Sequence, residues 1–259
     1  MSIILNEREW VEGAIASRQL GNRPMETLSR IARYYHQHEG YGRQEVRDKL
    51  DDYLLQCDPR IVLVKWSDAL DRISKNCGKH PLIEIDSVAI TEDELKAIDA
   101  LGSMQLGRLM FTLLCVAKYW NSVRPLKNNG WVNTVDKDIM RMANINTSIK
   151  RQSRLLYELR EAGLISFSKR VDNLNIRVEL VEPDSPVKLH VVDFRNLGNQ
   201  YMLYLGESFL QCAECGLAVR KKSNSQKYCP DCAAELHIKR CVESVMRRRE
   251  SDTRLAIRS

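Results

Sequence analysis

The sequence predicts a mainly α fold with a few short β-hairpins, an α+β chain of several domains. Apolar residues recur at helical spacing through most of the chain up to Ala162. Strand-like alternation is confined to short segments after Gly163, and two C-x-x-C pairs follow near the C-terminus. The 259 residues allow one to three domains, and a hydrophobic content of 44% is enough for a core.

Residues 1–100 are predicted to form a small helical bundle. Helical periodicity covers four segments, which are residues 8–18, 24–38, 44–56 and 62–77. A further helix is expected to begin at Thr91, because Glu94 stands three residues later in a capping pattern.

Residues 101–182 are predicted to form a second, central domain. Residues 104–121 read as a long helix with a broad apolar face, which Pro125 and Gly130 bring to an end. A short helix is expected over residues 134–143 with Thr134 as its candidate cap, and a further helix opens at Ser148. Gly163 stops this helix, and residues 164–168 and 176–181 alternate as two strands.

This order of elements resembles a winged helix-turn-helix. The run "LLYELREAGLI" at residues 155–165 is similar to the end of the recognition helix in bacterial and phage winged-helix proteins. The resemblance implies binding to double-stranded DNA, with the start of this helix in the major groove and the hairpin tip at the backbone or minor groove. The residues placed there by the resemblance are Ser148, Lys150, Arg151, Arg154, Lys169 and Arg170. Many winged helices act only as protein-binding modules, and that alternative stays open.

Residues 183–210 form the predicted connector between the central domain and the C-terminal segment. Their apolar content is too high for a flexible tether. We therefore expect a strand, then a packed turn and a helix that dock the C-terminal segment rigidly.

Residues 211–259 contain the most specific motif of the chain. Two C-x-x-C pairs, separated by thirteen residues, match the ligand pattern of a structural Zn²⁺ site with one ion per chain. The four ligands are Cys212, Cys215, Cys229 and Cys232. Four thiolates close the tetrahedron and leave no position for water or substrate. Two disulfides or a redox C-x-x-C are the alternative, which would need an oxidising compartment or a thioredoxin-like setting.

The residues around the cysteines resemble a treble-clef zinc finger. Gly216 suits a tight zinc knuckle, residues 217–222 suit a short strand, and Pro230 opens a helix. The run "KYCPDCAAE" is similar to small bacterial and phage zinc fingers. On this helix His237 is expected to point away from the metal, and Cys241 to pack against the finger.

Positive charge is concentrated in two blocks, although the net charge is only +6. Residues 211–259 carry 11 Lys and Arg against 6 Asp and Glu, and residues 150–178 carry 7 against 3, so the remainder is slightly acidic. This division predicts a side that faces a polyanion and a separate body. In the C-terminal block the candidate DNA contacts are Arg220, Lys221, Lys222, Arg247, Arg248 and Arg249.

Several classes of protein are disfavoured. No run of about 18 apolar residues predicts a membrane span, and the first residues do not resemble a signal peptide, so a cytoplasmic protein is expected. No phosphate-binding loop, zinc-protease motif, nucleophile elbow or dinucleotide fingerprint is present, so neither enzymatic activity nor a small-molecule substrate is expected.

The leading hypothesis is therefore a DNA-binding protein of phage or mobile-element type that regulates transcription or replication initiation in a bacterial cell. The first alternative is an adaptor or inhibitor that binds a host protein complex and uses the finger as a scaffold. The second is a metal-dependent nuclease, for which the available acids are Asp58, Asp68, Asp71, Glu84 and Asp86.

Overall fold

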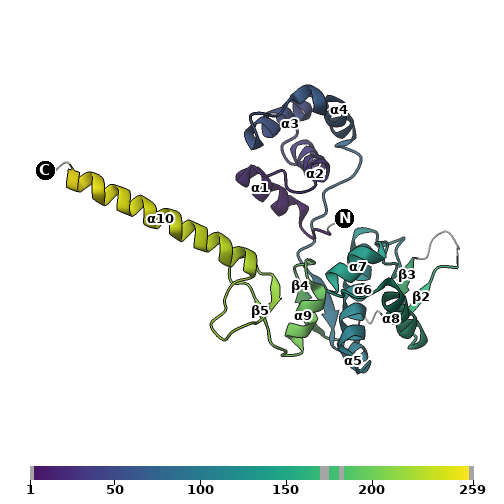
Figure 1. The fold of residues 1–259 in the computed structure, drawn as a ribbon. Coiled ribbons are helices and arrows are strands. Elements are labelled where there is room, and N and C mark those ends of the chain that lie inside the picture. The colour runs from purple at the N-terminus through teal and green to yellow at the C-terminus, as the bar shows by residue number, and fades with distance from the viewer. Residues whose placement is uncertain (1–2, 170–174, 181–183, 257–259) are drawn as a thin grey trace. The chain divides into compact units, whose positions relative to one another are not determined.

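The computed structural model describes residues 3–169, 175–180 and 184–256, with the side chains of α10 described as far as Arg247. The fold is mainly α with small antiparallel sheets, as the sequence predicted (Figure 1). The chain divides into two compact units, Ile3–Val88 and the chain from Ala89 onward. The segment from Ala89 to residue 100, which the sequence analysis grouped with the helical bundle, thus belongs to the second unit.

The first unit is a bundle of α-helices. Its elements are α1 (Glu7–Ser17), α2 (Pro24–Gln37), α3 (Arg43–Cys57), the 3₁₀ helix η1 (Leu63–Trp66) and α4 (Ser67–Asn76). Asn6 caps α1 by accepting a hydrogen bond from the backbone N–H of Glu9, and Pro24 opens α2. Leu28, Ile31 and Leu50 are fully buried in the core between the helices.

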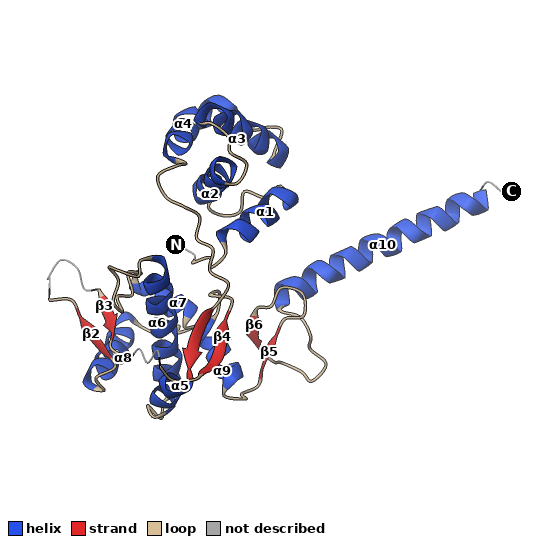
Figure 2. Cartoon of the chain, turned by 180° about the vertical axis from the view of Figure 1, so that it is seen from behind, coloured by secondary structure: helices blue, strands red, loops and turns tan. Residues whose placement is uncertain are grey.

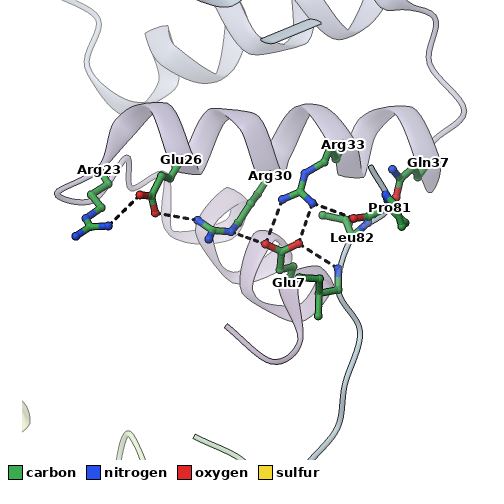
Figure 3. A network of polar contacts seen from close by, with 9 residues as sticks. Glu7, Arg23, Glu26, Arg30, Arg33, Gln37, Pro81 and Leu82 are labelled. Carbon is green, nitrogen blue, oxygen red and sulfur yellow. Dashed lines mark hydrogen bonds and ion pairs between the residues drawn. The ribbon is translucent and has the colours of Figure 1, made fainter. Parts of the chain in front are cut away.

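A buried ion network joins α1 and α2 to the end of this unit (Figure 3). The Glu7 carboxylate accepts hydrogen bonds from Arg30 Nε at 2.8 Å and Arg33 Nη2 at 3.1 Å. It also accepts one from the backbone N–H of Ile83 at 3.1 Å. Glu7 and Arg30 are only 4% and 5% exposed, so their charges need compensation, which they give each other and which Arg33 and Glu26 add to.

The second unit is built around α6 (Met104–Val123), whose side chains are buried along most of its length. It is preceded by β1 (Val88–Thr91) and α5 (Glu92–Asp99). As the capping pattern predicted, the Glu94 carboxylate accepts a hydrogen bond from the backbone N–H of Thr91 at 2.8 Å. Lys118 of α6 donates to the same carboxylate at 2.6 Å, which fixes α5 on α6.

Two further helices and a hairpin pack on α6. They are α7 (Asp136–Met142), α8 (Ile149–Glu161), β2 (Ile165–Phe167) and β3 (Ile176–Val178). The strands β2 and β3 are antiparallel with Ile165 opposite Val178, and a β-bridge joins Trp131 to Arg177. The order of helices and strands is the one that the sequence predicted.

The predicted cap of the short helix is wrong. Val135, and not Thr134, precedes the first residue of α7. The Thr134 hydroxyl instead accepts a hydrogen bond from Trp120 Nε1 at 3.2 Å, and a tertiary partner thus replaces the local one. The predicted start of the next helix at Ser148 is confirmed, and the Ser148 hydroxyl caps α8 by accepting a hydrogen bond from the backbone N–H of Arg151.

The C-terminal part begins with β4 (Val187–Val191), which pairs with β1, and α9 (Leu197–Tyr204). A strand and a helix in this order were predicted for the connector. There follow β5 (Phe209–Gln211), β6 (Ala218–Arg220) and the long helix α10 (Pro230–Ala256). Within this unit α8 packs on α6, α6 on α9, and α9 on β5 and β6, so α6 and α9 lie between α8 and the β5–β6 hairpin (Figure 2).

Helix α9 is held closely against α6 and α7. The Phe111 and Tyr201 rings lie 5.5 Å apart, and Tyr201 Oη donates a hydrogen bond to Asp99 Oδ1 at 2.6 Å. A Cβ atom on Gly198 would overlap the carbonyl oxygen of Ala143 at the end of α7.

Within the described residues, no helix has the length and apolar character that crossing a membrane requires.

Candidate functional site

The four predicted cysteine ligands gather at one point. Cys212 follows β5, Cys215 lies in the turn before β6, and Cys229 and Cys232 stand at the start of α10. The four Sγ atoms lie within 4.8 Å of one another, and all four residues are buried or half-buried. The chain therefore brings together sulfur atoms from segments that are well separated in the sequence.

The spacing of the sulfurs fits a metal ion. A tetrahedral zinc ion with bonds of about 2.3 Å to sulfur requires sulfur–sulfur separations of about 3.8 Å. The Sγ atoms of Cys215 and Cys229 are 3.8 Å apart. Four soft sulfur donors suit zinc or iron and leave no coordination position for a substrate, so a metal held here stabilises the local fold.

Backbone N–H groups and a tight turn support the cysteine sulfurs. The Cys229 backbone N–H donates to Cys212 Sγ at 3.2 Å, and the Cys232 N–H donates to Cys229 Sγ at 3.4 Å. Gly216 has a φ of 72°, which closes the turn, and its N–H donates to the Cys212 carbonyl at 2.9 Å. Donors directed at sulfur stabilise the thiolate form that binds metals.

The pKa values of Cys212 and Cys232 are shifted in opposite directions. Burial raises the pKa of Cys212, but the backbone N–H groups of Cys215, Cys229 and Glu214 outweigh it and lower that pKa to about 6. Hydrogen bonds to the sulfurs of Cys229 and Cys215, together with burial, raise the pKa of Cys232. Four crowded sulfurs cannot all carry a negative charge without a cation among them, so this donor set fits a bound metal ion.

Two further side chains on α10, His237 and Cys241, are not part of the four-sulfur group. The prediction that Cys241 packs against the finger is wrong, because Cys241 is exposed and its Sγ lies 3.6 Å from His237 Nε2.

The predicted DNA contacts on α8 share its solvent-facing side. Ser148, Lys150 and Arg154 are exposed. Arg154 Nε pairs with Glu158 at 2.9 Å, and Arg151 Nη1 approaches the same carboxylate at 3.5 Å. In the described part of the chain Lys150 has no ion-pair partner, so its charge faces solvent uncompensated.

Two apolar side chains of α8 are also exposed, and the inward position that helical periodicity predicts for Ile149 is wrong. Ile149 is 81% exposed and Tyr157 is 52% exposed, and the guanidinium of Arg160 lies 4.5 Å from the Tyr157 ring centre. Tyr157 lies seven residues after Lys150, so helical spacing places it with Lys150 and Arg154 on the side opposite the buried leucines. Ile149 lies seven residues before the buried Leu156, so spacing alone does not predict its exposure.

The remaining predicted contacts lie elsewhere. Lys169 is exposed just after β2, and Arg170 lies outside the described residues. Arg220 and Lys222 are exposed at the end of β6, Lys221 is half-buried, and Arg247 is exposed on α10. The side chains of Arg248 and Arg249 also lie outside the described residues.

The candidate nuclease acids do not form a metal-binding group within the described residues. Asp58 pairs with Arg60 at 3.0 Å, Asp71 with Arg47 at 2.7 Å, and Glu84 with His38 at 3.3 Å. In this part of the molecule these carboxylates make ion pairs in the first unit.

Comparison with models of protein families, with curated protein sequences and with solved structures found no match to this chain.

Proposed function

We propose that the chain binds double-stranded DNA through α8, as the recognition helix of a winged helix-turn-helix, and that its four cysteines hold a structural zinc ion. Such a protein would regulate transcription or replication. The observation that carries the proposal is the exposed surface of α8, where Lys150, Arg154 and the exposed Tyr157 lie opposite the buried leucines and Ile149 is exposed at the first residue of the helix. A helix that is buried on one side and presents cations with apolar groups on the other suits the major groove.

The order of the surrounding elements supports the same proposal. Helix α8 follows α7 after a short turn and is followed by the antiparallel strands β2 and β3, and Lys169 lies just after β2. In this frame α8 reads base edges and the hairpin contacts the backbone.

Two substitutions on α8 are expected to change the affinity for duplex DNA in opposite directions. Because Glu158 binds both Arg151 and Arg154, Glu158→Gln releases two cations on the face of α8 and is expected to strengthen duplex binding. Lys150→Ala is expected to weaken binding and to reduce the slope of log affinity against log salt by about one unit. Fluorescence anisotropy with a random-sequence duplex across a salt series measures both quantities.

Glu161→Gln is the matched control. It removes the same charge, but Glu161 pairs with Arg160 at the end of the helix. The proposal fails if Glu158→Gln and Glu161→Gln change the affinity equally, or if the parent chain shows no salt-dependent binding to duplex DNA.

A protein partner is the second candidate function, and α10 favours it. Four of its apolar side chains are between 49% and 61% exposed; they are Ile238, Val242, Val245 and Met246. Ile238, Val242 and Met246 follow one another at one helical turn, and Val245 lies next to Met246. Such a stripe suits an adaptor that binds a protein complex. If Ile238→Ser and Val242→Ser leave duplex binding unchanged while the α8 variants also have no effect on it, the adaptor function replaces the DNA-binding one.

A further inference from the structure

Asn199 of α9 connects two parts of the second unit that are far apart in the sequence. Its side chain is only 5% exposed. Nδ2 donates a hydrogen bond to the carbonyl oxygen of Ala218 at 2.9 Å, and Oδ1 accepts one from Asn144 Nδ2 at 2.9 Å. Ala218 is the first residue of β6, and Asn144 lies in the turn between α7 and α8.

The turn at Asn144 sets the direction in which α8 begins. Asn144 has a φ of 53°, the left-handed conformation that closes a helix C-terminus. The backbone N–H of Asn144 donates to the Arg141 carbonyl at 3.0 Å, and that of Ile145 donates to the Met140 carbonyl at 2.9 Å. These two bonds form a Schellman motif, so the exit of the chain from α7 is fixed by them and by what supports them.

Two other contacts hold this turn from outside. Arg108 of α6 donates to the carbonyl oxygen of Ala143 at 3.0 and 2.8 Å, and also to that of Asn144. On the side of α9, Gly198 packs directly on the Ala143 carbonyl. Helix α9 is therefore one of the two supports of the turn, and Asn199 supplies its side-chain hydrogen bond.

The other end of the connection is the four-cysteine site. Cys212 and Cys215 bracket the tight turn that joins β5 to β6, and the Cys212 N–H donates to the Leu217 carbonyl at 2.9 Å. Ala218 comes directly after this turn and is 2% exposed. A metal that fixes Cys212 and Cys215 thus also fixes the carbonyl that Asn199 contacts.

We propose that Asn199 transmits metal binding at the four cysteines to the α7–α8 turn, so that loss of the metal loosens the start of α8. When the metal leaves, β6 loses its anchor and the buried Asn199 amide loses its acceptor. A buried amide without a partner is unfavourable, so Asn199 reorients and releases Asn144 as well. The consequence for DNA rests on the proposed function, whereas the coupling to the turn does not.

Hydrogen exchange of the full-length chain, measured by mass spectrometry with zinc and after chelation, tests the coupling. In the parent chain, chelation is expected to speed exchange in peptides across residues 141–150 by about tenfold, as expected for the loss of one or two supporting hydrogen bonds. Peptides from α6 should keep their protection. In Asn199→Ala loaded with zinc, residues 141–150 should already exchange at the fast rate while the metal content is unchanged.

Two further variants sharpen the test. Asn199→Asp keeps an acceptor for Asn144 but places an oxygen against the Ala218 carbonyl, so chelation should no longer alter the turn. Asn196→Ala is the control, because Asn196 Nδ2 approaches the same carbonyl at 3.5 Å and makes no contact with Asn144. It should behave as the parent chain does.

Several results would overturn the coupling. One is unchanged exchange at residues 141–150 in the parent after the metal has left. Another is full protection of that turn in zinc-loaded Asn199→Ala, which decides the matter even if chelation unfolds the whole unit. Anisotropy with the random-sequence duplex separates the two proposals, since turn exchange that responds to metal without any DNA binding refutes only the proposed function.

Discussion

Glu7 is the centre of the buried ion network in the first unit. It neutralises Arg30 and Arg33 and also accepts from the backbone of Ile83 (Figure 3). Glu7→Gln leaves the buried Arg30 with only its longer ion pair to Glu26, at 3.6 Å, and we expect it to lower the free energy of unfolding of this unit by about 3 kcal/mol. Hydrogen exchange of α2 peptides across a urea series measures the change.

The matched control for this variant is Glu12→Gln on the same helix. Glu12 pairs with Arg8 at 3.1 Å, but the two side chains are 45% and 49% exposed and solvent screens the pair, so the loss should be far smaller than in Glu7→Gln. Equal urea midpoints for the Glu7 and Glu12 variants would show that the network contributes no more than a surface pair.

Tyr201 is expected to make the stability of the second unit depend on pH in the alkaline range. Burial raises the pKa of Tyr201, and its hydrogen bond to Asp99 and the negative charge of that carboxylate raise it further. The folded chain therefore keeps a proton that the unfolded chain releases above about pH 10, so the stability that Tyr201 contributes is complete below that pH and falls above it. In Tyr201→Phe the thermal midpoint should be lower at neutral pH, and it should fall less between about pH 9 and pH 11.

Tyr157→Phe provides the comparison, because this tyrosine is 52% exposed on α8. It should reproduce the alkaline profile of the parent chain. Identical alkaline losses in Tyr201→Phe and the parent would contradict the assignment.

At the scale of elements, the finger depends on its metal. Cys229→Ser removes one of four ligands, so we expect the metal content to fall from about one per chain to near zero and residues 209–232 to lose protection from exchange. Helix α6 should remain protected. Cys241→Ser, an exposed cysteine outside the group, should retain the metal. Unchanged metal content in Cys229→Ser would disprove the site.

The sequence predicted those elements whose signals are local. Ser148 and Gly163 mark the two ends of α8, and the pair Thr91 and Glu94 marks the start of α5. The predicted helix over residues 62–77 is divided into η1 and α4, and Thr134 bonds to Trp120 instead of capping α7. In the second case a tertiary partner took the hydroxyl, and such partners are not visible in local spacing.

Some residues of the candidate site could be predicted from the sequence and others could not. The four cysteines were predictable, because metal ligands have fixed spacing and fixed chemistry. Asn199 was not, since a lone asparagine in an apolar segment gives no indication of what its amide will contact. The pairing of Arg154 with Glu158 was readable in principle, because residues four apart meet on one helix face. Arg151 lies seven residues before Glu158, two turns away along the same face.

At the scale of the whole molecule, the question is whether one duplex contacts both α8 and the finger. If it does, Arg220→Ala with Lys222→Ala should reduce the salt slope by about two units, and this loss should add to that of Lys150→Ala. Both finger residues are exposed, so the fold should tolerate the change. An unchanged slope would mean that β6 faces a different partner, because α6 and α9 separate it from α8.

The contact between Gly198 and the Ala143 carbonyl also limits how the sequence can vary. No side chain fits between these two backbones, so even alanine would push α9 away from the turn. In a saturation library this position should tolerate substitution as poorly as the cysteines do, although it binds nothing. Related sequences could change many residues of the α9 surface and still would have to keep glycine at this one place.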